Sequence, residues 1–204
     1  GVRLVGSEMC IRDSNIIDWD FTLDDPGYFI LPEDGRIYRG WKKGGHGNIN
    51  LNDAIIESSN TFFFSLAYKS EIDDLTKHLS NFGFGEIVCL DCFLPDSGLL
   101  PNPSWKMNNL NFGWFKGDTV NLGVGQGYMS ATPIQLAYYA SFLANKGELN
   151  KFSFVQDNDN KEVKKNIFLS NNIDENDWLK LHESMIGVIA VSYTHLTLPT
   201  IAVV

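Results

Sequence analysis

The stretch Phe115-Lys-Gly-Asp-Thr-Val-Asn-Leu-Gly-Val-Gly-Gln-Gly-Tyr-Met-Ser-Ala-Thr-Pro-Ile-Gln-Leu-Ala137 decides the fold that we expect for this chain. Its second half has the pattern of a helix start: Thr132 is a good N-cap, Pro133 suits the first helical position, and Gln135 stands at capping-box spacing from the cap. We therefore expect an apolar helix from residue 133 onwards. Residues 119–122, earlier in the stretch, can be extended.

Three alternating glycines join these two parts, at positions 123, 125 and 127. Such a run suits a bend in which φ is positive or the backbone approaches a neighbour closely. A phosphate cradle is the alternative, but the spacing is not that of a dinucleotide fingerprint and no Gly-Lys-Ser/Thr follows. The glycines therefore favour a structural turn.

The composition sets outer limits on the function. The chain has 204 residues and a net charge of −9, which is enough for one domain with a real core. Nucleic acid is not an expected partner, because no basic stripe is present to contact phosphates. No apolar run approaches the roughly 18–20 residues that a membrane span needs.

Both ends of the chain look foreign to the rest. Residues 1–13 and 191–204 resemble translated sequencing-adapter sequence, so we expect them to be foreign and exclude them from fold reasoning. A genuine apolar, amphipathic tail is the alternative for these ends. The domain itself is then expected over residues 14–190.

Two of the three cysteines, Cys89 and Cys92, form a Cys-x-x-Cys pair. A redox pair or half of a metal site would have this spacing, but no second pair and no thioredoxin-like context accompanies it. The pattern favours two buried cysteines on a short strand. A structural disulfide is a further alternative if the domain faces an oxidising compartment.

Local signals predict a helix-rich domain with few strands. Asn50 caps one helix, with Asp53 three residues on, and residues 58–61 interrupt it before a second helix over residues 62–69. Further helices are expected over residues 73–82 and after Asp174. The apolar face of this last helix would be Trp178, Leu179, Leu181, Met185, Ile186 and Ile189.

The remaining segments carry turn and loop signals. Residues 15–40 are expected to be irregular apart from a short strand at 28–31, and residues 83–90 to form a bend and a strand. Residues 95–114, with several Asn and Pro, are predicted to be a long surface loop, and residues 150–172 a variable hairpin or loop.

The candidate active-site motif is Ser58-Ser59-Asn60, a Ser-x-Asn between two helices. By itself this pattern carries little information, because small polar residues also cap helices. On that alternative reading, Asn60 is the cap of the helix that follows.

The chain resembles the transpeptidase domain of class B penicillin-binding proteins, in particular the penicillin-binding protein 2 group of cell elongation. The motif Gly-Asp-Thr-…-Gly-x-Gly-Gln-Gly-Tyr-…-Ala-Thr-Pro-x-Gln-x-Ala matches residues 117–137, and the loop Trp41-Lys-Lys-Gly-Gly-His-Gly47 before Glu57-Ser-x-Asn60 is also similar. Residues 25–28 and 178–188 extend the resemblance to about residues 17–189.

This resemblance implies a mixed α/β, β-lactamase/transpeptidase-like fold, here a truncated domain with mostly the helical subdomain and an incomplete antiparallel sheet. It also implies acyl transfer by a serine nucleophile on peptidoglycan stem peptides. Ser58 would relay a proton between the catalytic lysine and an amine, and Asn60 would donate its side-chain amide to the substrate backbone. No cofactor is implied.

The chain departs from the family in lacking two motifs. No serine is followed three residues later by lysine, and no Lys-Ser/Thr-Gly occurs. We therefore expect a catalytically inert middle segment that β-lactams do not acylate. The alternatives are a β-lactam sensor or serine β-lactamase-like protein, and a non-catalytic scaffold relative.

A metal site and a cleft aromatic need separate mention. Asp25 and His46 could be two ligands of the metal site that some family members complete with Asp and Cys, but these positions are Gly40 and Ser59 here. Two ligands are too few for zinc, so we predict no metal, with His46 packing its loop. Trp41 either lines the cleft and contacts substrate or packs on the domain surface.

The resemblance also implies partners and a location. It implies a membrane anchor outside these residues, a domain at the periplasmic face of the bacterial inner membrane, and a glycosyltransferase partner of the elongation machinery. β-Lactams would bind covalently only to the full-length protein.

Overall fold

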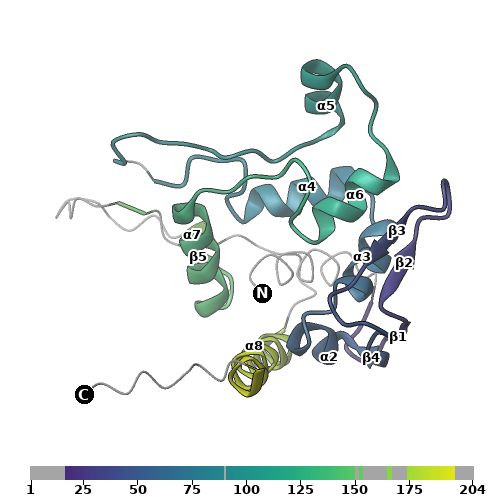
Figure 1. Ribbon diagram of the computed structural model, residues 1–204. Helices are drawn as coiled ribbons and strands as arrows, with labels where there is room; N and C mark the ends of the chain where they lie inside the picture. The colour runs from purple at the N-terminus through teal and green to yellow at the C-terminus, as the bar shows by residue number, and fades with distance from the viewer. Residues whose placement is uncertain (1–16, 90, 150–151, 154–164, 167–173, 196–204) are drawn as a thin grey trace, which may run out of the picture. The chain divides into compact units, whose positions relative to one another are not determined.

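A computed structural model of the chain describes residues 17–89, 91–149, 152–153, 165–166 and 174–195 (Figure 1). Its contacts divide these residues into two compact units. The first comprises residues 18–62 and 174–195, and the second comprises residue 17 and the described residues from 63 to 153 and 165–166.

Two pairs of short antiparallel strands occupy the start of the first unit. Strand β1 (Thr22–Asp25) pairs with β4 (Gly47–Asn50), which places Asp25 opposite Gly47. Strand β2 (Tyr28–Ile30) pairs with β3 (Ile37–Arg39). The short strand expected at 28–31 is confirmed, but the irregular structure expected for the rest of 15–40 is wrong, because β1 finds its partner more than 20 residues along the chain.

Two helices complete this unit. Helix α2 (Leu51–Ile56) starts as predicted, since the Asn50 side chain accepts the Asp53 N–H at 2.9 Å. Helix α8 (Glu175–His195) also starts as predicted: Asp174 and Asp177 cap each other's backbone N–H at 2.9 and 3.2 Å.

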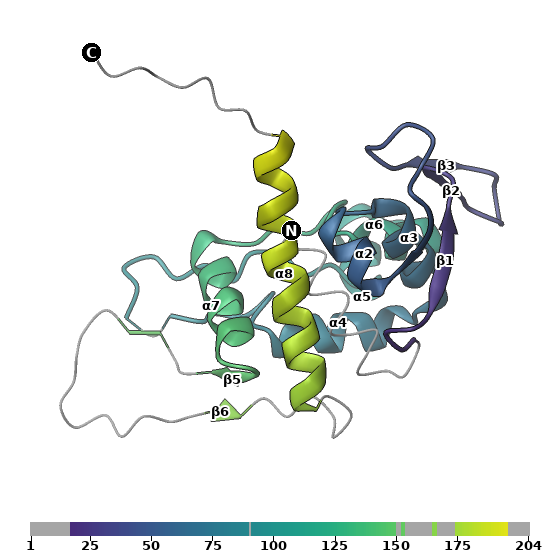
Figure 2. The ribbon, with the colours of Figure 1, turned by 90° about the horizontal axis from the view of Figure 1, so that it is seen from below.

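The buried face of α8 differs from the expected one. Trp178 and Leu181 are buried, but Leu179, Ile186 and Ile189 are at least half exposed. Ser184 is fully buried instead and donates to the Asn52 side chain at 2.7 Å. Gly187 packs so closely on Ile56 that an added Cβ would lie 2.7 Å from it, so small and polar residues let α8 lie against α2 (Figure 2).

The second unit is mostly helical. Its helices are the later part of α3 (Asn60–Lys69), α4 (Ile72–Asn81), α5 (Pro103–Leu110), α6 (Lys116–Gly123) and α7 (Pro133–Ala144). Aromatic rings from α7 and the end of α4 pack in the core, with Phe82 4.9 Å from Phe142 and 5.2 Å from Tyr139 between ring centres. The predicted helices at 62–69 and 73–82 are confirmed.

Two expectations in this unit are wrong. Residues 119–122 lie in α6 and are not extended, because the Asp118 carboxylate accepts the Phe115 N–H at 2.8 Å and caps a helix there. Residues 95–114 do not form one long loop, because Asn102 caps α5 by accepting the Trp105 N–H at 2.8 Å and Pro103 takes the first position.

The bend and helix start of the opening stretch are confirmed. Gly125 and Gly127 adopt φ of +67° and +78°, and Gly123 lies so close to α3 that an added Cβ would meet Ala67 Cβ at 2.2 Å. The Thr132 hydroxyl accepts the Gln135 N–H at 3.2 Å, and Gln135 accepts the Thr132 N–H at 2.9 Å. This capping box begins α7 as the sequence predicted.

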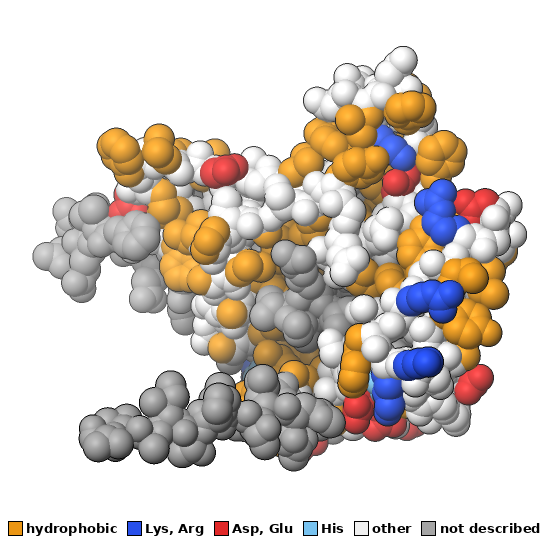
Figure 3. Space-filling view, viewed as in Figure 1, with side chains coloured by type: hydrophobic (Ala, Val, Ile, Leu, Met, Phe, Trp, Pro, Cys, Tyr) orange, Lys and Arg blue, Asp and Glu red, His pale blue; other side chains and the backbone are white. Residues whose placement is uncertain are grey.

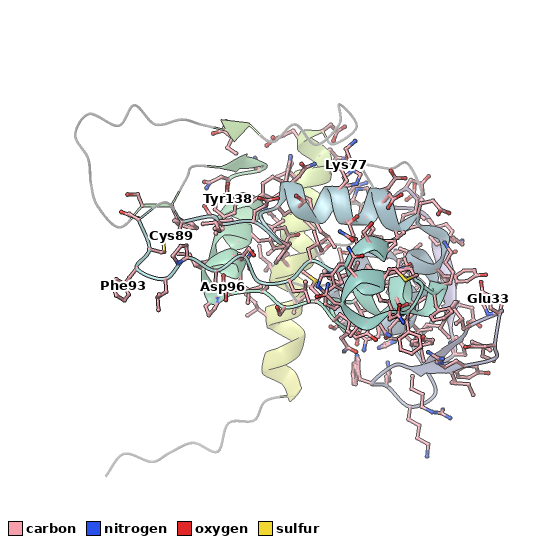
Figure 4. The ribbon with its side chains drawn as sticks, turned by 90° about the horizontal axis from the view of Figure 1, so that it is seen from above. Glu33, Lys77, Cys89, Phe93, Asp96 and Tyr138 are labelled. Carbon is pink, nitrogen blue, oxygen red and sulfur yellow. A yellow bond between two sulfur atoms is a disulfide. The ribbon has the colours of Figure 1, made fainter. Side chains whose placement is uncertain are left out.

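The remaining described segments are short. Strand β5 (Glu148–Leu149) pairs with β6 (Lys165–Asn166), so these residues form a hairpin, while most of 150–172 lies outside the described residues. Cys89 and Cys92 are joined by a disulfide (Figure 4). The expected strand there is wrong, since the described part of 83–90 forms only an isolated bridge at Cys89, and the disulfide alternative is the one found.

Candidate active-site motif and its support

The Ser-x-Asn motif forms the turn between α2 and α3. Helix α2 ends at Ile56 and α3 begins at Asn60. Ser58 adopts φ of 53°, a left-handed conformation that is uncommon for serine. The Ser59 hydroxyl accepts the Phe62 N–H at 3.2 Å, so Ser59 rather than Asn60 caps the helix. That leaves the side chains of Ser58 and Asn60 outside the capping hydrogen bond.

The carboxylate of Asp25 holds this turn from a distant part of the sequence. Asp25 is 1% exposed, and its Oδ2 accepts the Ser59 hydroxyl at 2.6 Å and lies 2.6 Å from His46 Nδ1. Its Oδ1 accepts the Gly27 N–H at 2.7 Å. One buried carboxylate therefore ties together the end of β1, the loop before β4 and the Ser-x-Asn turn.

These contacts keep Asp25 charged. Burial alone would raise the pKa of Asp25, but the hydrogen bonds from Ser59, His46, Gly27 and Thr61 outweigh it, and the net result is a pKa below the ordinary value. A charged acceptor also makes each hydrogen bond stronger than a neutral one would be.

His46 and Trp41 close the loop over this carboxylate. The His46 side chain is 4% exposed; its Nε2 has no hydrogen-bond partner and lies 3.9 Å from Glu57 Oε2. The Trp41 ring lies 5.5 Å from the His46 ring, and Trp41 Nε1 donates to the Glu57 carbonyl at 2.9 Å. Trp41 is nonetheless 58% exposed, which leaves ring surface available to a ligand.

Gly45 sets how closely this loop can approach. Its φ is +75°, and an added Cβ would lie 1.9 Å from the Asp25 carbonyl oxygen and 2.4 Å from the Gly27 nitrogen. Only glycine fits there. The His46 N–H donates to the same Asp25 carbonyl at 3.0 Å, so the backbone and the side chain of His46 both contact Asp25.

The donor set of this cluster does not fit a metal site such as the one considered from the sequence. Gly40 brings no side chain, and a Cβ added there would lie 3.0 Å from the Thr61 hydroxyl. Ser59 donates its hydroxyl proton to Asp25 Oδ2, the same oxygen that lies beside His46 Nδ1. Among the described residues no group of three His, Cys, Asp or Glu side chains is arranged to hold a metal ion.

The sequence paired Asp25 with His46, and the structure brings them together. The sequence did not reveal that Ser59 joins them. A signal was present in the resemblance stated from sequence, which implied that the positions of Asp25, His46 and Ser59 lie beside one another. The predicted roles of Ser58, Asn60 and Trp41 in binding or catalysis stay predictions.

With this fold and this turn in place, the class of the domain can be stated. The family of the penicillin-binding protein transpeptidase domain matches residues 10–202, and the chain belongs to that family. The resemblance stated from sequence and the predicted transpeptidase/β-lactamase-like fold class are thereby confirmed.

Several curated relatives that the chain matches are peptidoglycan D,D-transpeptidases. The peptidoglycan D,D-transpeptidase MrdA of Acinetobacter baumannii is 38% identical over 186 residues, which cover 85% of this chain. MrdA of Escherichia coli K12 is 34% identical over 185 residues, which cover 90% of this chain. The chain spans 27% of the length of each of these curated relatives.

The chain is also similar to solved structures of the same family. The chain is similar to penicillin-binding protein 2 (PBP2) of Pseudomonas aeruginosa, solved with WCK 5153, with a TM-score of 0.79 and 34% identity over 89% of this chain and 42% of that one. It is also similar to PBP2 of Helicobacter pylori, with a TM-score of 0.76 and 30% identity over 91% of this chain and 33% of that one. The Helicobacter protein has also been solved in complex with MreC.

Proposed function

We propose that this chain is the central segment of a peptidoglycan D,D-transpeptidase domain that cross-links stem peptides by serine acyl transfer in cell-wall elongation. The observation that carries the proposal is the Ser-x-Asn turn fixed by Asp25. Because the middle residue is bound to a buried carboxylate, the two outer residues are presented from a constrained backbone, as a positioned catalytic group requires.

In the whole protein, a serine of a Ser-x-x-Lys motif passes its proton to the lysine and attacks the carbonyl of the penultimate D-Ala. Ser58 relays that proton to the leaving amine of the terminal D-Ala. An amine of a neighbouring stem then attacks the acyl-enzyme and returns its proton by the same route. Asn60 donates its amide to the substrate backbone and positions the lysine.

The chain as given is inert on this proposal. It contains neither Ser-x-x-Lys nor Lys-Ser/Thr-Gly, so it lacks the nucleophile, its base and the motif that binds the substrate carboxylate. β-Lactams, which acylate the nucleophilic serine, bind covalently only to the full-length protein.

Partners and location follow from the same proposal. The whole protein works at the periplasmic face of the bacterial inner membrane with a glycosyltransferase of the elongation machinery. The MrdA relatives, named as peptidoglycan transpeptidases, support this assignment. Among the described residues, no helix has the length and apolar character needed to cross a membrane.

The test is a chimera in which residues 17–189 replace the matching segment of Escherichia coli MrdA. We expect a fluorescent penicillin to label the chimera and to leave the 204-residue chain unlabelled. Ser58→Ala and Asn60→Ala should each slow labelling of the chimera by about a hundredfold. Ser104→Ala, an exposed serine on α5, is the matched control and should label at the parent rate.

Three outcomes would count against the proposal. Labelling of the 204-residue chain would show that it carries its own nucleophile. A folded chimera that stays unlabelled would remove the transpeptidase assignment. Labelling of the Ser58 and Asn60 variants at the rate of the Ser104 control would leave the acyl transfer in place but remove both residues from it.

A further inference from the structure

Three aromatic rings of the second unit lie around the ammonium group of Lys106, whose side chain is 5% exposed, and a fourth ring packs against one of them. Lys106 Nζ lies 4.7 Å from the ring centre of Phe115, 5.7 Å from that of Tyr128 and 5.9 Å from that of Trp114. The ring of Trp105 lies 5.5 Å from the Tyr128 ring. We refer to these four side chains as the cage rings.

Hydrogen bonds hold the ring of Trp114 and the backbone of Phe115. Lys106 Nζ lies 2.5 Å from Asp118 Oδ2, which also accepts the Phe115 N–H at 2.8 Å. Trp114 Nε1 donates to the Thr119 hydroxyl at 2.9 Å. The charges of Lys106 and Asp118 cancel, so the cage carries no net charge, and a ligand would lose little affinity to ordering the Trp114 ring.

The outer surfaces of these rings are available. Phe115 is 63% exposed, Tyr128 is 43% exposed, and Phe112 nearby in sequence is 64% exposed. Hydrophobic side chains gather over α5 and the segment that follows it, at the top of the view in Figure 3. Contiguous exposed apolar surface of this kind marks a binding site more often than chance.

Most polar residues around the rings are amides. Lys116, which follows Phe115, is charged, but its Nζ donates to the Ser70 carbonyl at 3.0 Å and lies 3.6 Å from Glu71. From residue 99 to residue 115 the only charged residue is Lys106, and it is buried and paired. The same region exposes four asparagine side chains, and Gln126 next to the glycine bend is also exposed. The asparagines are Asn102, Asn108, Asn109 and Asn111.

We propose that the cage rings and these amides bind the glycan strand of peptidoglycan, a neutral N-acetylated polysaccharide. Sugar rings present C–H faces that pack on aromatic rings, and their hydroxyl and N-acetyl groups pair with amide side chains, which both donate and accept. This inference rests on the proposed function, because it assigns to the chain the polysaccharide that carries the stem peptides.

Other classes of ligand fit this surface less well. Nucleic acid binding depends on exposed cations along a groove, and the one cation of the cage is neutralised by Asp118. An anionic bilayer surface would likewise be contacted through exposed Lys or Arg beside the apolar side chains. A protein partner would also bury the apolar residues, but a surface that binds only protein would not bind an isolated polysaccharide.

The test is co-sedimentation of the 204-residue chain with chitin, an insoluble and neutral polymer of N-acetylglucosamine that carries no stem peptides. We expect the chain to sediment with chitin. Phe115→Ala and Tyr128→Ala should each weaken the binding about fivefold to tenfold, as expected for the loss of one ring contact. Phe115→Tyr, which keeps the ring, should bind as the parent does.

The control is Phe93→Ala. Phe93 is 95% exposed on the loop that follows the Cys89–Cys92 disulfide, at the outer edge of this unit in Figure 4. Its removal should leave sedimentation unchanged. If Phe93→Ala weakens binding as much as Phe115→Ala, the effect is general stickiness and the proposal is wrong.

Two further results would overturn the inference. Chitin could fail to sediment the chain, or only intact peptidoglycan could do so, which would mean that the surface binds peptide. Because chitin contains no acylation site, this result is independent of penicillin labelling in the chimera. A labelled chimera whose segment does not bind glycan would contradict the glycan surface and leave the transpeptidase proposal standing.

Discussion

Replacing Asp25 should destabilise the first unit more than replacing any surface carboxylate. In Asp25→Ala, the Ser59 hydroxyl and His46 Nδ1 both lose an acceptor 2.6 Å away in a site where Asp25 is 1% exposed. A hydrogen bond to a charged group contributes about 1.5–3 kcal/mol, and a buried donor without a partner costs about 1–3 kcal/mol. Water can reach the half-buried Gly27 N–H, so only the hydrogen bonds from Ser59 and His46 are counted. We expect the free energy of unfolding to fall by about 3–5 kcal/mol.

Asp34 provides a matched control. Like Asp25, it accepts the N–H of the residue two positions on, here Arg36 at 2.9 Å, and it also pairs with the Arg36 side chain at 3.3 Å. Its side chain is 44% exposed, so water replaces the lost contacts. We expect Asp34→Ala to cost less than about 1 kcal/mol.

The measurement is urea unfolding of the chain and its two variants at neutral pH, followed by tryptophan fluorescence. A free energy of unfolding for Asp25→Ala within about 1 kcal/mol of the Asp34→Ala value would refute the reasoning. It would mean that the turn holding Ser58 and Asn60 does not depend on the carboxylate. In that case the support assigned to the Ser-x-Asn motif would also be wrong.

Three further predictions follow from the same geometry. The pKa of Asp25 is lowered on folding, so the charged Asp25 adds to the free energy of unfolding fully above the unfolded pKa of about 3.9, and this addition is lost as pH falls through the folded pKa. In urea titrations from pH 5 to pH 2, Asp25→Asn should therefore reduce the fall in the free energy of unfolding with decreasing pH. Gly45→Ala should cost at least about 2 kcal/mol more than Gly44→Ala in the same assay, because both have positive φ but only Gly45 contacts backbone. Lys106→Met should lower the free energy of unfolding by about 3 kcal/mol, because it leaves the Asp118 carboxylate without its ion-pair partner. Adding Asp118→Asn to this variant should recover part of the loss. A thermal unfolding midpoint of Lys106→Met equal to that of the parent would contradict the prediction.

Helix starts were predictable where a usual capping residue and its hydrogen-bond partner lie three residues apart in the chain. Asn50 with Asp53, Thr132 with Gln135 and Asp174 with Asp177 form the expected hydrogen bonds. Capping is a local interaction over three residues, so the sequence contains all of its physics. The start of α6 was missed because Phe115, which stands at its N-cap, is not a usual capping residue, although Asp118 accepts the Phe115 N–H over the same three-residue spacing.

Strands and buried faces were predicted less well because they depend on distant partners. Strand β1 is a strand only because residues 47–50 pair with it. The face of α8 follows from Ser184 and Gly187, which allow close packing on α2, and hydrophobic periodicity gives small or polar residues no weight. α5 carried its local signal at Asn102 and Pro103, but the surrounding asparagines favoured a loop.

The cluster around Asp25 shows how a residue that reads as a lost ligand can have a different task. Judged by metal chemistry, Gly40 and Ser59 leave Asp25 and His46 incomplete. In the structure, the Ser59 hydroxyl supplies a hydrogen bond to Asp25 in a buried site, and the absence of a side chain at Gly40 leaves room beside the Thr61 hydroxyl, which also stabilises the charged carboxylate. A buried carboxylate needs either a cation or a full set of donors. This chain provides donors, so the position of the Ser-x-Asn turn follows from hydrogen bonds between Asp25, His46 and Ser59.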